Sequence, residues 1–127
     1  MDLVVLMKKI LVIDDNLDIR ENSIEILELS GYHVFGAADG QAGIDLAIRE
    51  IPDIIICDIM MPLIDGYEVL QRLRNHSQTA HIPFVFLTAR SEKRDIQNGM
   101  DLGADGYLVK PFEDFELLDV IELRLNR

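Results

Sequence analysis

The sequence lacks several features that whole classes of protein require. Its 127 residues include no tryptophan, one cysteine, and 12 lysine and arginine residues against 23 aspartate and glutamate residues. The lone Cys57 has no internal partner, which excludes the disulfide framework of small secreted domains. The formal charge of −11 and the pI near 4.5 leave no basic surface for a nucleic-acid backbone or an anionic membrane.

Long hydrophobic runs are also missing. No stretch approaches the roughly 18 apolar residues of a membrane span. The apolar run Leu3–Met7 follows an acidic residue and precedes two lysines, which is the reverse of a signal peptide. We therefore expect a cytoplasmic protein whose start is either Met1 or Met7, with residues 1–7 as an N-terminal extension.

The composition is that of one globular domain. Hydrophobic residues make up 49% of the chain and charged residues 28%, and no linker, repeat or low-complexity stretch divides it. We expect this domain to span residues 8–125, a length that can bury a core of its own.

Short apolar runs alternate with segments of helical periodicity. Several of the runs are continuously apolar, as in strands buried on both faces of a parallel sheet. The predicted strands are 10–13, 34–37, 54–57, 84–87 and 107–109, and the predicted helices lie near 16–30, 40–50, 66–75, 92–102 and 113–125. This alternation predicts an α/β fold with helices on both faces of the sheet.

Polar residues follow four of the five strands. Asp14 and Asp15 follow the first, Asp58 the third, Thr88 the fourth and Lys110 the fifth. Ligands of such folds bind at the carboxyl ends of the strands, so we expect these side chains to converge there. Hard oxygen ligands without histidine or cysteine favour Mg²⁺, and an ammonium and a hydroxyl suit phosphoryl oxygens. The set therefore predicts phosphoryl transfer, in which positioning and charge neutralisation dominate.

The chain resembles the receiver domain of two-component response regulators, among them the chemotaxis regulators. The likeness runs from about Lys8 to Leu125, and its motifs occur in the family's order. They are Leu11-Val12-Ile13-Asp14-Asp15, Cys57-Asp58-Ile59-Met60-Met61-Pro62 continuing to Asp65-Gly66, Leu87-Thr88-Ala89, and Lys110-Pro111-Phe112. Ile64 stands where the family more often has methionine. The resemblance implies a three-layer flavodoxin-like (βα)5 fold with a five-stranded parallel sheet in the order 2-1-3-4-5.

The resemblance also implies the role of each acidic residue. Asp58 would be the phosphoacceptor, taking its phosphoryl group from a histidine kinase or a histidine phosphotransfer protein. Asp14 and Asp15 would hold Mg²⁺ together with Asp58 and the backbone carbonyl of Met60. The protein would be a phosphorylation-activated signalling switch and not an enzyme, apart from its own phosphorylation and slow dephosphorylation.

Three further residues would report the phosphorylated state. By the same likeness, Thr88 would bond a phosphoryl oxygen, Lys110 would pair with the phosphoryl group, and Tyr107 would be the switch aromatic. The Lys110-Pro111 bond would be cis. Output, to an effector or a second copy of the chain, would use the fourth helix, fifth strand and fifth helix.

The lifetime of the phosphoryl group is expected to be minutes or longer. In the family, the residues two after the phosphoacceptor and two after the threonine tune dephosphorylation. Here they are Met60 and Arg90, and neither has a carboxamide to position a water molecule.

Other readings remain open at this stage. Asp14, Asp15 or Asn16 can simply cap a helix, and Asp65-Gly66 suggests an ordinary turn. A Mg²⁺-dependent phosphatase of the haloacid-dehalogenase type would need Asp-x-Asp after the first strand and a cap domain, whereas this chain has Asp14-Asp15-Asn16. A nucleotide or flavin binder would need a glycine-rich phosphate loop. A pseudo-receiver would not need the complete acidic set.

Overall fold

The structure, a computed structural model, describes residues 7–89 and 93–125 of the chain. The strands are β1 (Lys9–Ile13), β2 (His33–Ala37), β3 (Ile54–Asp58), β4 (Phe84–Ala89) and β5 (Gly106–Lys110). The helices are α2 (Leu17–Leu29), α3 (Gly40–Glu50), α4 (Gly66–Arg74), α5 (Lys93–Asp101) and α6 (Asp114–Leu125). Each predicted strand and helix is present.

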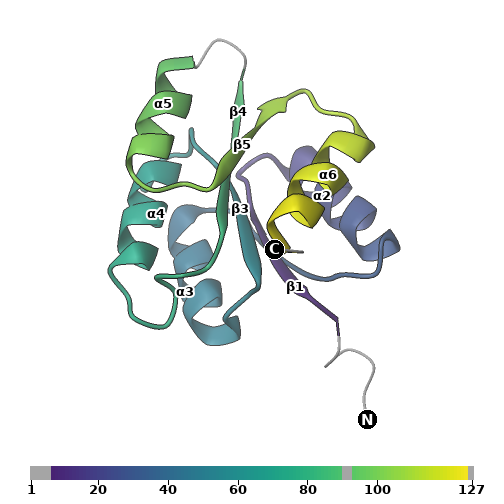
Figure 1. Cartoon of the computed structure of the whole chain (residues 1–127), viewed down its shortest axis with the longest axis horizontal. Helices are drawn as coiled ribbons and strands as arrows, with labels where there is room; N and C mark the ends of the chain where they lie inside the picture. The colour runs from purple at the N-terminus through teal and green to yellow at the C-terminus, as the bar shows by residue number, and fades with distance from the viewer. Residues whose placement is uncertain (1–6, 90–92, 126–127) are drawn as a thin grey trace.

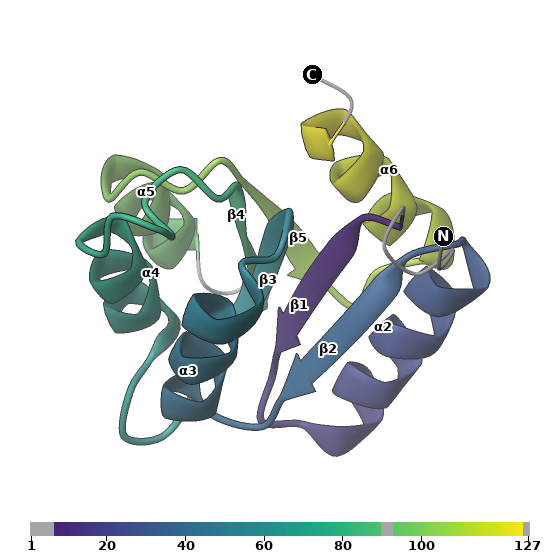
Figure 2. The ribbon, with the colours of Figure 1, turned by 90° about the horizontal axis from the view of Figure 1, so that it is seen from below.

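The strands form one parallel sheet in the order β2-β1-β3-β4-β5, which confirms the predicted fold class (Figure 1). Figure 2 shows the three layers, with α2 and α6 on one face of the sheet and α3, α4 and α5 on the other. Parallel strands direct all their carboxyl ends to one edge, so the chain order alone brings distant polar residues together.

Two apolar clusters hold the layers together. Alternate residues of β1 point to opposite faces: Leu11 and Ile13 join the cluster under α3 and α4, while Ile10 and Val12 join the one under α2 and α6. All four are essentially inaccessible to solvent. Burying each such side chain stabilises the fold by about 2 kcal/mol before conformational entropy is counted.

The structure corrects several details of the sequence interpretation. Asp58, Thr88 and Lys110 do not follow their strands but are residues of β3, β4 and β5. In α6 the fully buried positions are Leu117 and Ile121.

Other elements differ less. His33 lies half-buried in β2 against the ring of Phe35. Gly31 and Gly103 lie just after the ends of α2 and α5, and both glycines adopt positive φ angles. Among the described residues no helix is long and apolar enough to cross a membrane.

Candidate functional site

Three carboxylates meet at the carboxyl edge of the sheet. Oxygen atoms of Asp14, Asp15 and Asp58 all lie within 4.8 Å of one another. Asp14 is fully buried and Asp58 is 8% exposed, whereas Asp15 is exposed. The convergence expected from the strand order is therefore present for these three residues.

The turn from β1 into α2 directs Asp14 toward this cluster. The amide of Asp14 donates to the carbonyl of Ala37 at 3.1 Å, and the amide of Asn16 donates to Asp14 Oδ1 at 2.9 Å. Asn16 is the residue that caps α2, since its side chain accepts a hydrogen bond from the amide of Ile19 at 3.0 Å. Asn16 is therefore the residue that caps α2, and the side chains of Asp14 and Asp15 are both part of the acidic cluster.

Lys110 brings a positive charge to the same place from the end of β5. Its Nζ lies 3.0 Å from Asp14 Oδ2 and 3.3 Å from Asp58 Oδ1. Burial opposes the charge on Lys110, but the nearby Asp58 and Asp14 outweigh burial and raise the pKa of the ammonium group. The Lys110-Pro111 bond is cis, as expected.

The surroundings of Asp58 perturb its acidity. Burial raises its pKa to about 6; Lys110 opposes the rise, and the charges of Asp14 and Asp15 add to it. A second positive charge placed among these oxygens would relieve both the repulsion and the cost of burial. This need for a cation fits a divalent ion at this site.

The donor set suits Mg²⁺ in particular. All three side chains offer hard carboxylate oxygens, and the exposed position of Asp15 leaves the site open to water, which Mg²⁺ retains in most protein sites. Cys57 adjoins Asp58, but burial, followed by the charges of Asp58 and Asp14, raises the pKa of its thiol well above the ordinary value. A protonated, buried thiol is a poor ligand and a poor nucleophile.

The other predicted site residues lie around this centre. Thr88 is buried in β4, at the same edge of the sheet, and Tyr107 is 47% exposed on β5. Met60 lies in the loop after β3 with its side chain 61% exposed, whereas Met61 is buried. Arg90 lies outside the described residues.

Sequence reasoning missed the role of Gly66, which it assigned with Asp65 to an ordinary turn. Asp65 caps α4, and the amide of Gly66 donates to the carbonyl of Ile59 at 2.8 Å. A Cβ atom on Gly66 would collide with the carbonyl oxygen of Asp58 and lie 2.9 Å from the Cα of Ile59. The Asp-Gly pair therefore lets the first residue of α4 pack directly on the backbone of Asp58.

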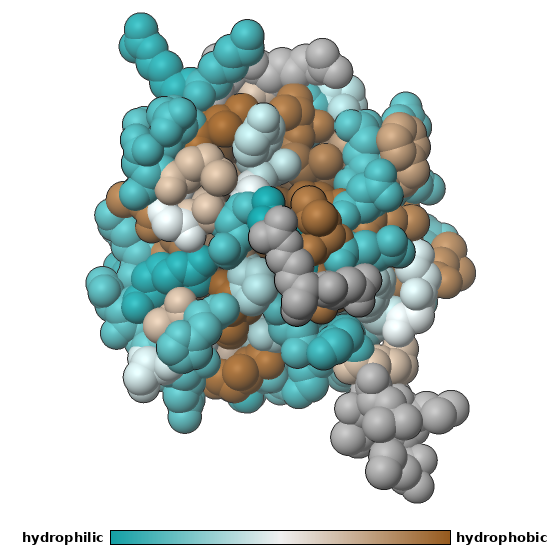
Figure 3. Space-filling view, in the orientation of Figure 1, coloured by the Kyte–Doolittle hydropathy of each residue, from teal (hydrophilic) through white to brown (hydrophobic). Residues whose placement is uncertain are grey.

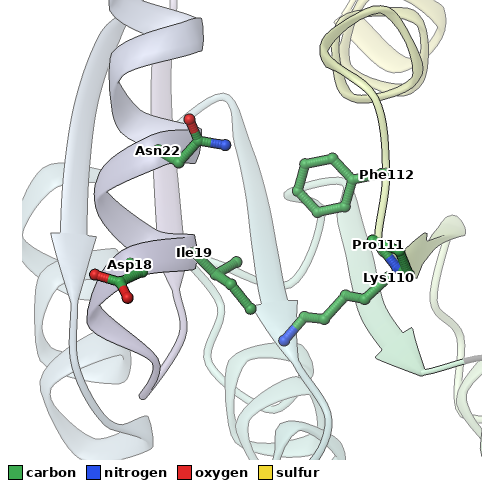
Figure 4. A pocket seen from close by; sticks show the side chains of 6 residues that line it. All are labelled: Asp18, Ile19, Asn22, Lys110, Pro111 and Phe112. Atoms are coloured by element: carbon green, nitrogen blue, oxygen red, sulfur yellow. The ribbon is translucent and has the colours of Figure 1, made fainter.

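A pocket of about 580 Å³ opens beside the ammonium of Lys110. Figure 4 shows Phe112 and Ile19 facing each other across it, with α2 on one side and the segment after β5 on the other. The pocket gives a larger molecule apolar surface next to the acidic cluster.

Comparison with known proteins identifies the family. The sequence model of the response regulator receiver domain matches residues 10–122. The chain belongs to this family, whose members are signalling switches rather than enzymes that turn over a small-molecule substrate.

The curated relatives are longer regulators. The chain is 44% identical over 121 residues to the DNA-binding dual master transcriptional regulator RpaA of Synechocystis, covering 95% of this chain and 50% of RpaA. It is 41% identical over 121 residues to the transcriptional regulatory protein CpxR of Escherichia coli, with the same two shares. The chain thus spans about half the length of these relatives.

Solved structures confirm the fold. The chemotaxis protein CheY4 of Vibrio cholerae superimposes with a TM-score of 0.89 at 36% identity, over 94% of this chain and 99% of that one. The receiver domain of a signal transduction histidine kinase from Syntrophus aciditrophicus matches with a TM-score of 0.81 at 31% identity, over 94% and 90% of the two chains.

Proposed function

We propose that Asp58 accepts a phosphoryl group from a phosphohistidine on a histidine kinase or a histidine phosphotransfer protein. The observation that carries this proposal is the placement of Asp58 between two further carboxylates and the ammonium of Lys110. A carboxylate oxygen of Asp58 attacks phosphorus, the P–N bond to the imidazole breaks, and its electron pair stays on the imidazole nitrogen. Lys110 stabilises the charge of the phosphoryl oxygens.

Asp14, Asp15, Asp58 and the backbone carbonyl of Met60 are the proposed ligands of Mg²⁺. The bound ion would neutralise charge on the phosphoryl group during transfer. The clustering and hardness of the carboxylate oxygens support this assignment.

Thr88 and Tyr107 are proposed to convert phosphorylation into a change of surface. Tyr107 lines a pocket on the face formed by α5, β5 and α6, together with Ile96 and Val109. Figure 3 shows apolar surface among hydrophilic side chains on this face. A reorientation of Tyr107, coupled to a bond from Thr88 to the phosphoryl group, would change what an effector or a second copy of the chain meets there.

We further propose a phosphoryl lifetime of minutes or longer, since Met60 and Arg90 offer no carboxamide for an attacking water.

The proposed domain spans residues 8–125, preceded by the extension 1–7, and acts in the cytoplasm without binding nucleic acid itself. The net charge of −11 supports the last point.

The test is phosphorylation by acetyl phosphate in the presence of Mg²⁺, read by intact mass. The wild-type chain should gain the mass of one phosphoryl group, and Asp58→Asn should gain none. An adduct that persists in Asp58→Asn would refute the assignment of the phosphoacceptor. Decay of the isolated phosphoprotein within seconds, with Mg²⁺ present, would refute the proposed lifetime.

A further inference from the structure

Asp14 is held by contacts from four directions. Its amide, Oδ1 and carbonyl oxygen form hydrogen bonds within 3.1 Å, and its Oδ2 forms an ion pair with Lys110 at 3.0 Å. The partner of the carbonyl is Arg20, whose Nη1 donates to it at 2.8 Å. No sequence motif pointed to this arginine.

Arg20 crosses a glycine of the neighbouring strand on its way to Asp14. It is the fourth residue of α2, and its aliphatic stem passes over Gly36 of β2. A Cβ on Gly36 would already lie 3.5 Å from Cδ of Arg20 and 2.7 Å from Cδ1 of Ile24. The stem of the half-buried arginine therefore lies at contact distance over the backbone of Gly36 and runs along the sheet toward the end of β1.

The carbonyl that accepts this bond belongs to the peptide between Asp14 and Asp15. Its orientation therefore sets the direction from which Asp15 projects. Asp15 is exposed, so packing does little to hold it. Mg²⁺ requires nearly ideal octahedral geometry, and a small rotation of this peptide would move one ligand away from the other two.

Electrostatics alone would not favour an arginine here. A guanidinium beside a cation site repels the incoming ion, so a purely electrostatic role predicts weaker Mg²⁺ binding with Arg20 than without it. A geometric role predicts the opposite. The two roles differ in the sign of one measurable quantity.

We infer that Arg20 is a positioning residue that aligns Asp14 and Asp15 for Mg²⁺. It acts through the Asp14 carbonyl and touches neither the ion nor the phosphoryl group. The inference rests on the proposed metal site.

The test is the Mg²⁺ dissociation constant measured by calorimetry on the full chain. Arg20→Met keeps the aliphatic stem over Gly36 but removes the donor, and should weaken Mg²⁺ binding roughly tenfold or more, as loss of an outer-shell partner does elsewhere. Arg20→Lys keeps a donor and should recover part of the loss. The matched control is Arg72→Met, because Arg72 pairs with Glu68 on the exposed face of α4 and its loss changes the charge equally.

Thermal melts of the metal-free variants complete the design. Unchanged or tighter Mg²⁺ binding by Arg20→Met overturns the inference, including the case in which only the melting temperature falls. If Arg20→Met does not fold, the Mg²⁺ affinity of Arg20→Lys tests the inference instead. That affinity must be lower than the affinity of the wild type. Absence of Mg²⁺ binding by the wild-type chain would instead overturn the proposed metal site.

Discussion

The surroundings of Asp58 disfavour the ionised form of its carboxyl group. The carboxyl group is buried beside two other carboxylates, and its folded-state pKa of about 6 exceeds the ordinary value of 3.8 for an aspartate. The folded chain therefore binds a proton more readily than the unfolded chain between these two values. Stability from this group is fully present at low pH and is lost as the pH rises through about 6.

Asp58→Asn should accordingly stabilise the metal-free fold at pH 7.5. A shift of about two pKa units sets an upper limit of about 3 kcal/mol on the gain. The gain should shrink as the pH falls through 6 toward 4, where the wild-type carboxyl is protonated. Urea unfolding of both proteins at pH 7.5 and 5 measures it, with exposed Asp119→Asn as the control. An equal gain at both pH values would contradict the assigned pKa.

Lys110→Met should have the opposite effect. Removing the ammonium leaves buried Asp14 and Asp58 without their positive partner, which should destabilise the metal-free fold by about 3 kcal/mol at pH 7.5. The pKa of Asp58 should also rise above 6, because Lys110 is the group that lowers it. Carbon-13 NMR of the aspartate carboxyls would follow that titration, and an unchanged pKa would show that Lys110 does not face Asp58.

At the scale of elements, one arginine joins three segments at the edge opposite the acidic site. Arg74, the last residue of α4, donates to the carbonyls of Ala80, Ile82 and Gly103 and to the carboxylate of Asp105. These bonds fasten the end of α4 to the start of β4 and to the connection before β5.

Arg74→Met should destabilise the chain by about 2 kcal/mol, since several hydrogen bonds of roughly 1 kcal/mol each are lost and water replaces part of them. Mg²⁺ affinity should stay the same, because the carboxyl edge lies at the other end of the sheet. Urea unfolding and calorimetry on the same samples test both statements. A fall in Mg²⁺ affinity would show that the two edges are coupled.

The elements themselves could be predicted from the sequence because their signals are local. The runs at 10–13 and 54–57 are apolar throughout, and the acidic residues come where these runs end. Parallel pairing then places Asp14 near Asp58 without further information. The positions at the carboxyl edge of the sheet follow from strand order alone.

Contacts between distant segments could not be predicted in this way. Arg74 meets Asp105 across 31 positions, and Arg20 reaches the carbonyl of Asp14 along a path over Gly36 of another strand. No periodicity marks either arginine, since both read as ordinary charged helix residues. The buried face of α6 is not determined by the sequence alone for a related reason, since apolar residues surround much of that helix and packing on the sheet selects among them.

At the scale of the whole molecule, the excess of negative charge acts against the compact state. The formal charge of −11 means that acidic side chains are in excess, and they repel one another more strongly in the folded chain because they lie closer together. Part of that negative charge is concentrated in the acidic cluster. General screening and specific Mg²⁺ binding should therefore both stabilise the chain, by amounts that can be separated.

Mg²⁺ should raise the melting temperature by more than NaCl of equal ionic strength. At a concentration 100 times its dissociation constant, a ligand that binds only the folded state adds about 2.7 kcal/mol, which corresponds to several degrees for a domain of this size. EDTA should remove that gain and leave the NaCl effect, and Asp14→Asn should behave like the EDTA-treated wild type. Equal shifts with the two salts would reduce the role of Mg²⁺ to screening.

Gly66 limits how this chain can vary. Every amino acid that a single base change can produce from a glycine codon carries a Cβ, and any Cβ here collides with the carbonyl oxygen of Asp58. A mutation at this codon would therefore displace either α4 or the phosphoacceptor itself, so that fold and signal fail together. Among natural variants and in a saturation library selected for signalling, this position should remain fixed while exposed residues of the same helix, such as Gln71, change freely.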